Sequence, residues 1–376
     1  LRLEQFRGYA ALDVAFTAGP QLVWGPNAAG KTSLLEAIAL LAWGHSHRST
    51  SDPDLIRWGA DVARAEGRLG SAGDRVEVAL VRPGSPAAGG GARKRVRVNG
   101  VARRTSVLGA HLRVVLFAPE DMLLVAGSPT LRRATLDRVA SSLWPAYADA
   151  LATYGRALQQ RNGLLRLIRE ETATRAELRY WDEPFVAAGA SVVEGRHRLL
   201  AALAAPLAAA HAEIAPDEAA AASLGLRYLT NAPQVPGEDA RAALTRRLAE
   251  TAEKEAWNGT TLIGPHRDDV AFELAGRDLA GFASRGQQRT AILALKLAEL
   301  DLLTEHDRRP PLVLLDDVFS ELDPARRSHL VRRIAGLPQA FVTTTTLDDL
   351  DPALRASATA WEVRVGDDAG AQLVGG

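Results

Sequence analysis

Apolar and polar residues alternate in short runs over the first part of the chain, a period of two that is typical of β-strands. The pattern predicts strands at residues 1–6, 12–16 and 21–24, followed by a helix over 32–43. Further strands are expected at 62–69, 75–81, 93–98 and 114–117, with a Gly/Pro/Ala-rich hairpin loop at 83–91. This part of the chain is therefore expected to have an α/β fold.

The pattern changes to helical spacing between about residue 130 and residue 215, where Leu, Ala, Arg and Glu dominate. Breaks between helices are expected near Pro145, at 181–184 and near Pro216. A strand at 224–229 and a helix at 240–257 follow, and β/α alternation returns after Thr260. The order predicts a split α/β domain, with halves at 1–130 and 259–376, into which a helical unit at 131–258 is inserted.

Residues 25–32 read G-P-N-A-A-G-K-T and match the phosphate-binding pattern G-x-x-x-x-G-K-[ST] in full. The run lies between a predicted strand and a predicted helix, where free N–H groups at the helix start point toward an anion. A chance glycine loop with a surface lysine is the alternative, and the correct flanking elements count against it. We expect an ATP site formed by Gly25, Pro26, Asn27, Ala28, Ala29, Gly30, Lys31, Thr32 and Ser33.

Within this loop, Lys31 is expected to carry positive charge to the β- and γ-phosphates, and the Thr32 hydroxyl to bind Mg²⁺. Four apolar residues at 312–315 then lead to Asp316 and Asp317, as in a buried strand that ends in two acids. Asp316 is the expected second metal residue, and Asp317 the catalytic residue that orients or deprotonates the attacking water. A strand followed by helix-capping acids would explain this pair equally well if the phosphate loop were not present.

Two shorter motifs narrow the class. Ser284, Gly286 and Gln287 precede an apolar helix expected at 290–303 and resemble the signature motif of ABC ATPases, and 320–323, ending in Asp323, resembles their D-loop. A serine at a helix start is also a good N-cap in its own right. In ABC ATPases the signature of one subunit faces the γ-phosphate held by another, where the helix dipole favours negative charge. The resemblance implies that these residues complete the ATP site between two copies.

Four further stretches resemble the RecF family over essentially the whole chain. They are L-R-L-E-Q-F-R-G-Y at 1–9, F-A-P-E-D at 117–121 in the place of the Q-loop, the stretch at 124–137, and G-P-H-R-D-D at 264–269. Like that family, the chain has an aspartate, Asp317, where ABC ATPases usually have a catalytic glutamate. It also has threonines at 343–346 where transporters have a switch histidine. Both departures favour slow hydrolysis, suited to a switch.

The resemblance implies an ABC-type P-loop ATPase head, of class α/β, with an inserted helical second lobe. It also implies that ATP and Mg²⁺ are cofactors, that ATP closes a homodimer around double-stranded DNA without regard to sequence, and that hydrolysis releases it. The RecF family acts near single-strand/double-strand junctions with RecR and RecO to help RecA load at gaps, in DNA replication, gap repair and the SOS response.

The distribution of charged residues indicates where DNA could bind. The chain has 45 basic and 45 acidic residues, so it is not a uniformly basic nucleic-acid binder and any contact must be local. The candidates are arginine-rich clusters, each of which could equally be a solvated face. They comprise Arg93, Lys94, Arg95 and Arg97; Arg103 and Arg104; and Arg132 and Arg133, which could instead be packing residues.

Composition excludes several other classes. The absence of cysteine excludes disulfides and thiolate metal sites, no apolar run is long enough for a membrane span, and no export signal is evident, so we expect a cytoplasmic protein. A transporter ATPase would have only a short segment between the phosphate loop and the signature motif, whereas about 250 residues separate Thr32 from Ser284 in this chain. An SMC-type or RecN-like structural ATPase would need long heptad runs, and a nuclease with an ABC head would need clustered carboxylates elsewhere.

Overall fold

The computed structural model describes residues 1–70, 73–86, 93–366 and 370–375. The chain divides into two compact units, which we call the head unit (residues 1–122 and 299–376) and the insert unit (residues 123–298). The sequence-based boundaries, at 131 and 259, lie elsewhere. Residues after 260 resume β/α alternation, but the strand at Asp269–Leu274 pairs with Leu224–Leu229 rather than with the head sheet.

The head unit contains a twelve-stranded sheet in the order β7-β6-β5-β4-β1-β2-β15-β14-β3-β13-β12-β8. Its members are β1 (Arg2–Phe6), β2 (Tyr9–Asp13), β3 (Gly19–Trp24), β4 (Val62–Arg68), β5 (Arg75–Val81), β6 (Lys94–Val98), β7 (Val101–Arg103), β8 (Val114–Phe117), β12 (Leu312–Asp316), β13 (Gln339–Thr344), β14 (Thr359–Gly366) and β15 (Gly370–Gly375). Strands β14, β3, β13, β12 and β8 run parallel, and the other pairings are antiparallel. Because the carboxyl ends of parallel strands meet at one edge, this edge positions the candidate site.

Helix α1 (Lys31–Trp43) is the centre of the head core, and nearly all of its residues are buried. After its first turn the sequence is apolar except for Glu36, which pairs with Arg7, as expected for a helix enclosed on most sides. Gly30 and Gly44, both with positive φ, stand at its two ends. The remaining head helices are short: α2 (Leu108–His111), α11 (Pro324–Ala335), α12 (Pro352–Ser357), and single turns at Asp52–Leu55, Thr105–Val107, Pro119–Met122, Val318–Glu321 and Leu347–Asp349.

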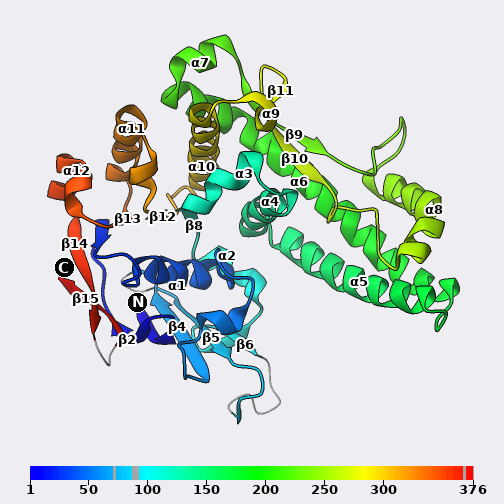
Figure 1. The fold of residues 1–376 in the computed structure, drawn as a ribbon, viewed down its shortest axis with the longest axis horizontal. Coiled ribbons are helices and arrows are strands. Elements are labelled where there is room, and N and C mark those ends of the chain that lie inside the picture. The colour runs from blue at the N-terminus through cyan, green and yellow to red at the C-terminus, as the bar shows by residue number, and fades with distance from the viewer. Residues whose placement is uncertain (71–72, 87–92, 367–369, 376) are drawn as a thin grey trace. The chain divides into compact units, whose positions relative to one another are not determined.

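The insert unit combines helices with a small antiparallel sheet in the order β11-β10-β9. Its elements are α3 (Leu123–Ala126), α4 (Pro129–Leu143), α5 (Pro145–Arg169), a single turn at Arg175–Leu178, α6 (Arg179–Ile214), α7 (Pro216–Ala221), β9 (Leu224–Leu229), α8 (Ala240–Asn258), β10 (Asp269–Leu274), β11 (Arg277–Asp278) and α9 (Leu279–Phe282). Helices α5, α6 and α8 pack side by side (Figure 1). Helix α10 (Arg285–Asp307) begins in the insert unit and ends in the head unit.

Most predicted elements are present, and two predictions were wrong. Strand β2 begins at Tyr9 and ends at Asp13, so the strand predicted at 12–16 was displaced. The break predicted at 181–184 does not occur, because α6 runs through Pro184 and Pro206, and its packing against α5 and α8 compensates for the missing backbone bonds. Strands β5 and β6 form the expected hairpin, and residues 87–91 of its loop lie outside the described residues.

Within the described ranges, no helix combines the length and the apolar character that crossing a membrane would require.

Candidate nucleotide-binding site

The phosphate loop follows β3 and wraps back to the start of α1, with left-handed backbone at Gly25 (φ 148°), Ala28 (φ 63°) and Gly30 (φ 118°). A Cβ atom at Gly25 would lie 2.5 Å from the Val363 carbonyl oxygen of β14, so only glycine fits there. Ala28 adopts the same left-handed region although it has a side chain, which costs energy in an L-residue. The loop is therefore held in a strained conformation by its neighbours.

Lys31 lies inside this loop and is 8% exposed. Its ammonium donates to the carbonyl oxygens of Gly25 (2.8 Å) and Pro26 (2.9 Å). Burial lowers the pKa of Lys31, while the charges of Asp317 and Asp316 act in the opposite direction. Carbonyl dipoles are weak partners for a buried cation compared with an anion, so the ammonium is well placed to receive a phosphate.

The Thr32 hydroxyl donates to Oδ1 of Asp316 at 2.9 Å, which joins the start of α1 to the end of β12. A second hydroxyl, that of Thr343 on β13, donates to the same oxygen at 2.7 Å. The backbone N–H of Asp317 donates to the Thr343 hydroxyl oxygen at 3.0 Å, and Asp317 has left-handed backbone (φ 51°). One threonine hydroxyl thus orients both acids.

Sequence reasoning assigned no role to Thr343, which it treated only as part of the threonine run at 343–346. The signal that could have found it is β-sheet register, because Thr343 is the residue of β13 directly opposite Asp316 of β12. Register between distant strands cannot be read from either strand alone.

The donor set at this edge fits Mg²⁺. The Thr32 hydroxyl and the Asp316 carboxylate are hard oxygen ligands, which Mg²⁺ prefers, and they lie within hydrogen-bond distance of each other. Over the stretches of chain that the structure describes, no group of three or more His, Cys, Asp or Glu residues could hold a metal ion elsewhere.

The signature residues lie in the insert unit, at the start of α10. The Ser284 hydroxyl oxygen accepts from the Gln287 N–H (3.2 Å), and the Gln287 side-chain oxygen accepts from the Ser284 N–H (3.1 Å). This reciprocal pair is a capping box. Ser284 is exposed and Gly286 is half-buried.

The D-loop residue Asp323 lies in the head unit as the N-cap of α11. Its side chain accepts from the Arg326 N–H at 3.0 Å and forms an ion pair with the Arg326 guanidinium. Ser320 lies three residues earlier, in the single turn at Val318–Glu321, and its hydroxyl donates to the Asp317 carbonyl oxygen at 2.8 Å. The D-loop is therefore tied locally to the acid pair and to the next helix.

The two acids of the Q-loop stretch at 117–121 differ in their burial. Asp121 is buried and its Oδ2 accepts from the Ala118 N–H at 2.8 Å, which closes the turn. Glu120 is exposed and lies 3.8 Å from the Arg48 Nε. Glu120 is therefore the acid of this stretch that solvent or a ligand can reach.

The two stretches at 124–137 and 264–269, far apart in sequence, fold onto each other within the insert unit. Arg132 binds Asp269 through two hydrogen bonds of 2.7 and 2.8 Å, and Arg133 donates to the Asp268 carbonyl oxygen at 2.7 Å. Their guanidinium groups are thus used inside the unit.

A buried arginine on α6 completes this network. Arg196 binds both carboxylate oxygens of Asp137 (2.8 and 2.9 Å), and donates to the Pro265 carbonyl oxygen and to the Tyr228 hydroxyl. The Tyr228 hydroxyl in turn donates to Asp268 at 2.6 Å. Every charged group in this chain of contacts has a charged or strongly polar partner.

His266 belongs to the same stretch. Its Nε2 faces the Thr261 carbonyl oxygen at 3.3 Å and must carry the ring proton, so its Nδ1 accepts from the Tyr154 hydroxyl at 2.6 Å. Burial lowers the pKa of His266 to about 4, and the charges of Arg267, Arg133 and Arg161 act in the same direction. His266 is therefore neutral at physiological pH and structural in its contacts.

The basic residues at 93–97 alternate between the two faces of β6 and its extension. Lys94 points inward, where its ammonium donates to the Gly44 carbonyl oxygen (2.7 Å) and pairs with Asp52 (2.8 Å). Arg93, Arg95 and Arg97 are exposed on the opposite side, and Arg103 and Arg104 are exposed at the end of β7. Sequence reasoning could not separate Lys94 from its neighbours without knowing which face of the strand is covered.

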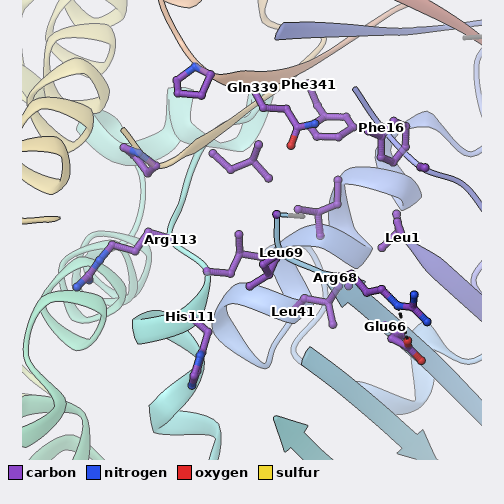
Figure 2. A pocket seen from close by; sticks show the side chains of 18 of the residues that line it. Leu1, Phe16, Leu41, Glu66, Arg68, Leu69, His111, Arg113, Gln339 and Phe341 are labelled. Carbon is purple, nitrogen blue, oxygen red and sulfur yellow. Dashed lines mark ion pairs between the residues drawn. The ribbon is translucent and has the colours of Figure 1, made fainter. Parts of the chain in front are cut away.

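A cavity of the head unit, about 1220 Å³, is separate from the phosphate loop. It lies at the amino ends of β12 and β13, beside Leu312 and Gln339, whereas Asp316 and Thr343 lie toward the carboxyl ends. Figure 2 shows Leu41 and Phe341 among its apolar residues and Arg68, His111 and Arg113 among its polar ones. This cavity therefore lies at the opposite end of the sheet from the acid pair.

Parallel strands that deliver a phosphate loop and an acid pair to one sheet edge, followed by a D-loop, define a P-loop ATPase head of the ABC type. The fold comparison agrees. An SMC head domain derived from Pyrococcus furiosus matches with a TM-score of 0.52 over 99% of this chain and 94% of that chain, at 15% identity, a likeness of fold alone.

The family model described as "RecF/RecN/SMC N terminal domain" matches residues 1–360. The chain is 39% identical to the DNA replication and repair protein RecF of Symbiobacterium thermophilum, over 93% of this chain and 92% of that protein. It is 40% identical to RecF of Chloroflexus aggregans, over 97% of each. The chain belongs to the RecF family.

The solved structure of "the recombination mediator protein RecF-ATP in RecFOR pathway" matches with a TM-score of 0.85 and 29% identity, over 99% of this chain and 96% of that one. A companion RecF-ATPrS structure matches with a TM-score of 0.86. The expected fold, an ABC-type head with an inserted second lobe, is confirmed.

Proposed function

We propose that this protein is an ATP-driven switch that closes as a homodimer on double-stranded DNA and reopens after slow hydrolysis. The observation that carries the proposal is the hydrogen bond from Thr32 to Asp316, which joins the phosphate loop to the acid strand. In this site Lys31 binds the β- and γ-phosphates, and Thr32 and Asp316 hold the metal. Mg²⁺, when bound, supplies positive charge to the phosphates.

Asp317 is the proposed catalytic residue. Its backbone is fixed by the hydrogen bond to Thr343, and its carboxylate is near enough to Lys31 to influence the pKa of that ammonium. The carboxylate therefore lies at the phosphate end of the site, where it can orient or deprotonate the attacking water. A carboxylate one methylene shorter than glutamate reaches less far, which favours slow turnover.

Dimerisation is proposed to bring Ser284, Gly286 and Gln287 of one copy to the γ-phosphate held by the other, together with the D-loop residue Asp323. The capping box keeps the first N–H groups of α10 in a helical arrangement, and Ser284 is exposed. A helix N-terminus attracts anions through its dipole. Two such sites make ATP the link between two chains.

The proposed DNA contact is an arginine stripe, which we define as Arg93, Arg95 and Arg97. Alternate residues of a strand are about 6.7 Å apart on one face, close to the axial rise of two nucleotides in one strand of a duplex, about 6.8 Å. The stripe can therefore follow phosphates without reading bases. Arg103 and Arg104 extend the exposed basic surface, whereas Lys94 is used internally.

The cellular role of the switch is proposed by analogy with the relatives. The matched solved protein is a recombination mediator of the RecFOR pathway, so we propose that this chain acts with RecR and RecO at single-strand/double-strand junctions to help RecA load. Its role would lie in DNA replication, gap repair and the SOS response, in the cytoplasm, the compartment that the cysteine-free composition favours. The alternative is a structural repair ATPase of the SMC or RecN type, which α5 and α6 do not favour because they end within the insert unit.

The test is the molar mass of the purified chain by size exclusion with light scattering, with and without ATP·Mg²⁺ and duplex DNA. We expect a monomer without nucleotide and a dimer with ATP. Ser284→Arg should leave nucleotide binding largely intact and abolish the dimer. Normal ATP-driven dimerisation of that variant would overturn the composite-site proposal.

DNA binding is tested through its salt dependence. Replacing Arg93, Arg95 and Arg97 with alanine should reduce the slope of log K against log salt by about 0.9 for each of these arginines that binds a phosphate, and leave ATP-driven dimerisation without DNA unchanged. Replacing Arg103 and Arg104 provides the comparison with a second exposed cluster. An unchanged slope in the triple variant would exclude the stripe as the contact surface.

A further inference from the structure

Arg132, on α4 of the insert unit, has more polar partners than a surface arginine. Its side chain is 11% exposed. Two nitrogens bind the carboxylate of Asp269 side-on, and the third donates to the carbonyl oxygens of Gly127 (2.8 Å), Leu124 (3.2 Å) and Val125 (3.2 Å). The planar guanidinium thus joins two segments that are about 140 residues apart in sequence.

The first segment is the end of α3. Leu124 and Val125 carry carbonyl groups at the end of this short helix, which have no partner within it, and Gly127 follows it directly; a cation at a helix C-terminus satisfies such carbonyls. Helix α3 follows directly after the turn at Pro119–Met122, the stretch in the place of the Q-loop. Arg132 therefore fixes the point at which the chain leaves the Q-loop stretch.

The second segment is the start of β10. Burial by itself would raise the pKa of Asp269, but the hydrogen bonds from Arg132 and from the Val270 N–H hold it below its usual range, so the carboxylate stays charged. Strand β10 leads through β11 into α9, and α9 ends at Phe282, with only Ala283 between it and Ser284. Arg132 therefore also fixes the point at which the chain enters the approach to the signature.

The two segments meet again at α9. Helix α9 packs against both α3 and β10, and its Leu279 is buried, as are Leu124 and Val125 of α3. Asp278 caps α9 by accepting from the Ala280 N–H at 2.9 Å. The position of α9, and of the serine that follows it, depends on how α3 and β10 are held together.

We propose that Arg132 is a positioning residue for the signature motif, which it holds in place by clamping the end of α3 to the start of β10. The clamp makes the exit of the Q-loop stretch and the entry to the signature parts of one rigid assembly. Its effect on ATP-driven dimerisation rests on the proposed function. Its effect on the order of the signature segment does not.

The test uses Arg132→Lys, which keeps the charge but lacks the planar fork, and Asp269→Asn, which keeps the shape but lacks the charge. The matched control is Arg227→Lys, which weakens the exposed ion pair between Arg227 and Glu273 on the same sheet without touching α3. Hydrogen exchange of the nucleotide-free chain should be faster at 123–127 and 279–288 in both clamp variants, and unchanged in the control. Exchange at wild-type rates in both clamp variants would overturn the proposal.

The functional consequence is measured separately. We expect ATP·Mg²⁺ to bind the clamp variants with wild-type affinity, and the dimer to weaken about tenfold or more, within the range typical of coupling between sites. The double variant should be no worse than the more affected single variant, because both act through one contact. If the wild-type chain did not dimerise with ATP, the proposed function would fail while the exchange result stood. If wild type dimerised and Arg132→Lys dimerised equally well, the signature-positioning role would fail alone.

Discussion

The two units use polar groups in opposite ways. At the sheet edge of the head unit, cations and hydroxyls share few acceptors: Lys31 binds loop carbonyls, and Thr32 and Thr343 both donate to one oxygen of Asp316. In the network that joins α4, α6 and β10 of the insert unit, the charges have matched partners, as in the two-fold contact between Arg196 and Asp137. The first arrangement is left open for a ligand, and the second is closed on itself.

Because of this difference, mutations in the two units should change different properties of the protein. Removing a group from the head site should change affinity for nucleotide or metal and leave the free energy of unfolding nearly unchanged, because the group is incompletely paired. Removing a group from the insert network leaves a buried charge without its counterion, which is costly. Substitutions in the two units can test this division.

Asp317→Asn should give the largest change in activity. Loss of a general base or water-orienting carboxylate typically costs about 10²- to 10⁴-fold in rate, so steady-state hydrolysis should fall by this order while ATP binding persists. Asp316→Asn, at the metal end, should instead weaken Mg²⁺-dependent binding. Equal loss of nucleotide affinity in the two variants would contradict separate roles for the acids.

Arg196→Met should give the largest loss of stability. It leaves Asp137, whose side chain is 15% exposed, without its charged partner and with only the Tyr147 hydroxyl donating to it. Breaking a largely buried ion pair in this way costs about 3 to 5 kcal/mol, measured by urea unfolding. Nucleotide affinity of the folded chain should stay at the wild-type value. The exposed pair of Arg227 and Glu273 is the control, since Arg227→Met should cost less than about 1 kcal/mol. Similar losses in both variants would show that the network is not a closed core.

Thr343→Val should raise the Mg²⁺ concentration needed for nucleotide binding by about 10- to 100-fold, as is typical when a group that orients a metal ligand is removed. Thr343→Ser keeps the hydroxyl and should retain most of the wild-type affinity. Thr344→Val removes the neighbouring hydroxyl, which donates to the Thr346 carbonyl oxygen rather than to an acid, and should leave the Mg²⁺ titration unchanged. A wild-type titration for Thr343→Val would remove its role in the site.

His266 should make the insert unit sensitive to acid. Its pKa is about 4 in the folded chain and 6.5 as its ordinary value, so the unfolded chain binds more protons between these pH values and stability falls as pH is lowered. From pH 7 to pH 5 the loss should be about 2 kcal/mol, measured by unfolding at each pH. His266→Gln should flatten this dependence. An equal slope in the variant would show that other groups cause the acid sensitivity.

Local motifs were predicted from sequence because their geometry is built from neighbouring residues. The loop at 25–32, the acids after β12 and the capped serine at the start of α10 each depend on a few consecutive backbone torsions and on the residue types that permit them. The same reasoning located the strands at 75–81, 114–117 and 224–229, whose alternation reflects burial on one or both faces.

Contacts between residues that are distant in sequence depend on the tertiary structure. Thr343 acquires its place through the register of β13 against β12, Lys94 is separated from Arg93 and Arg95 by which face of β6 is covered, and Arg132 turns inward because Asp269 lies opposite. None of these partners is near in sequence, and residue type alone fits a solvated charge equally well. The motifs of the chain were enough to identify the family and to predict the chemistry of the ATP site. The packing of distant segments decided which polar residues remain available to a ligand, because a charge is free to bind only when the fold has not already given it a partner.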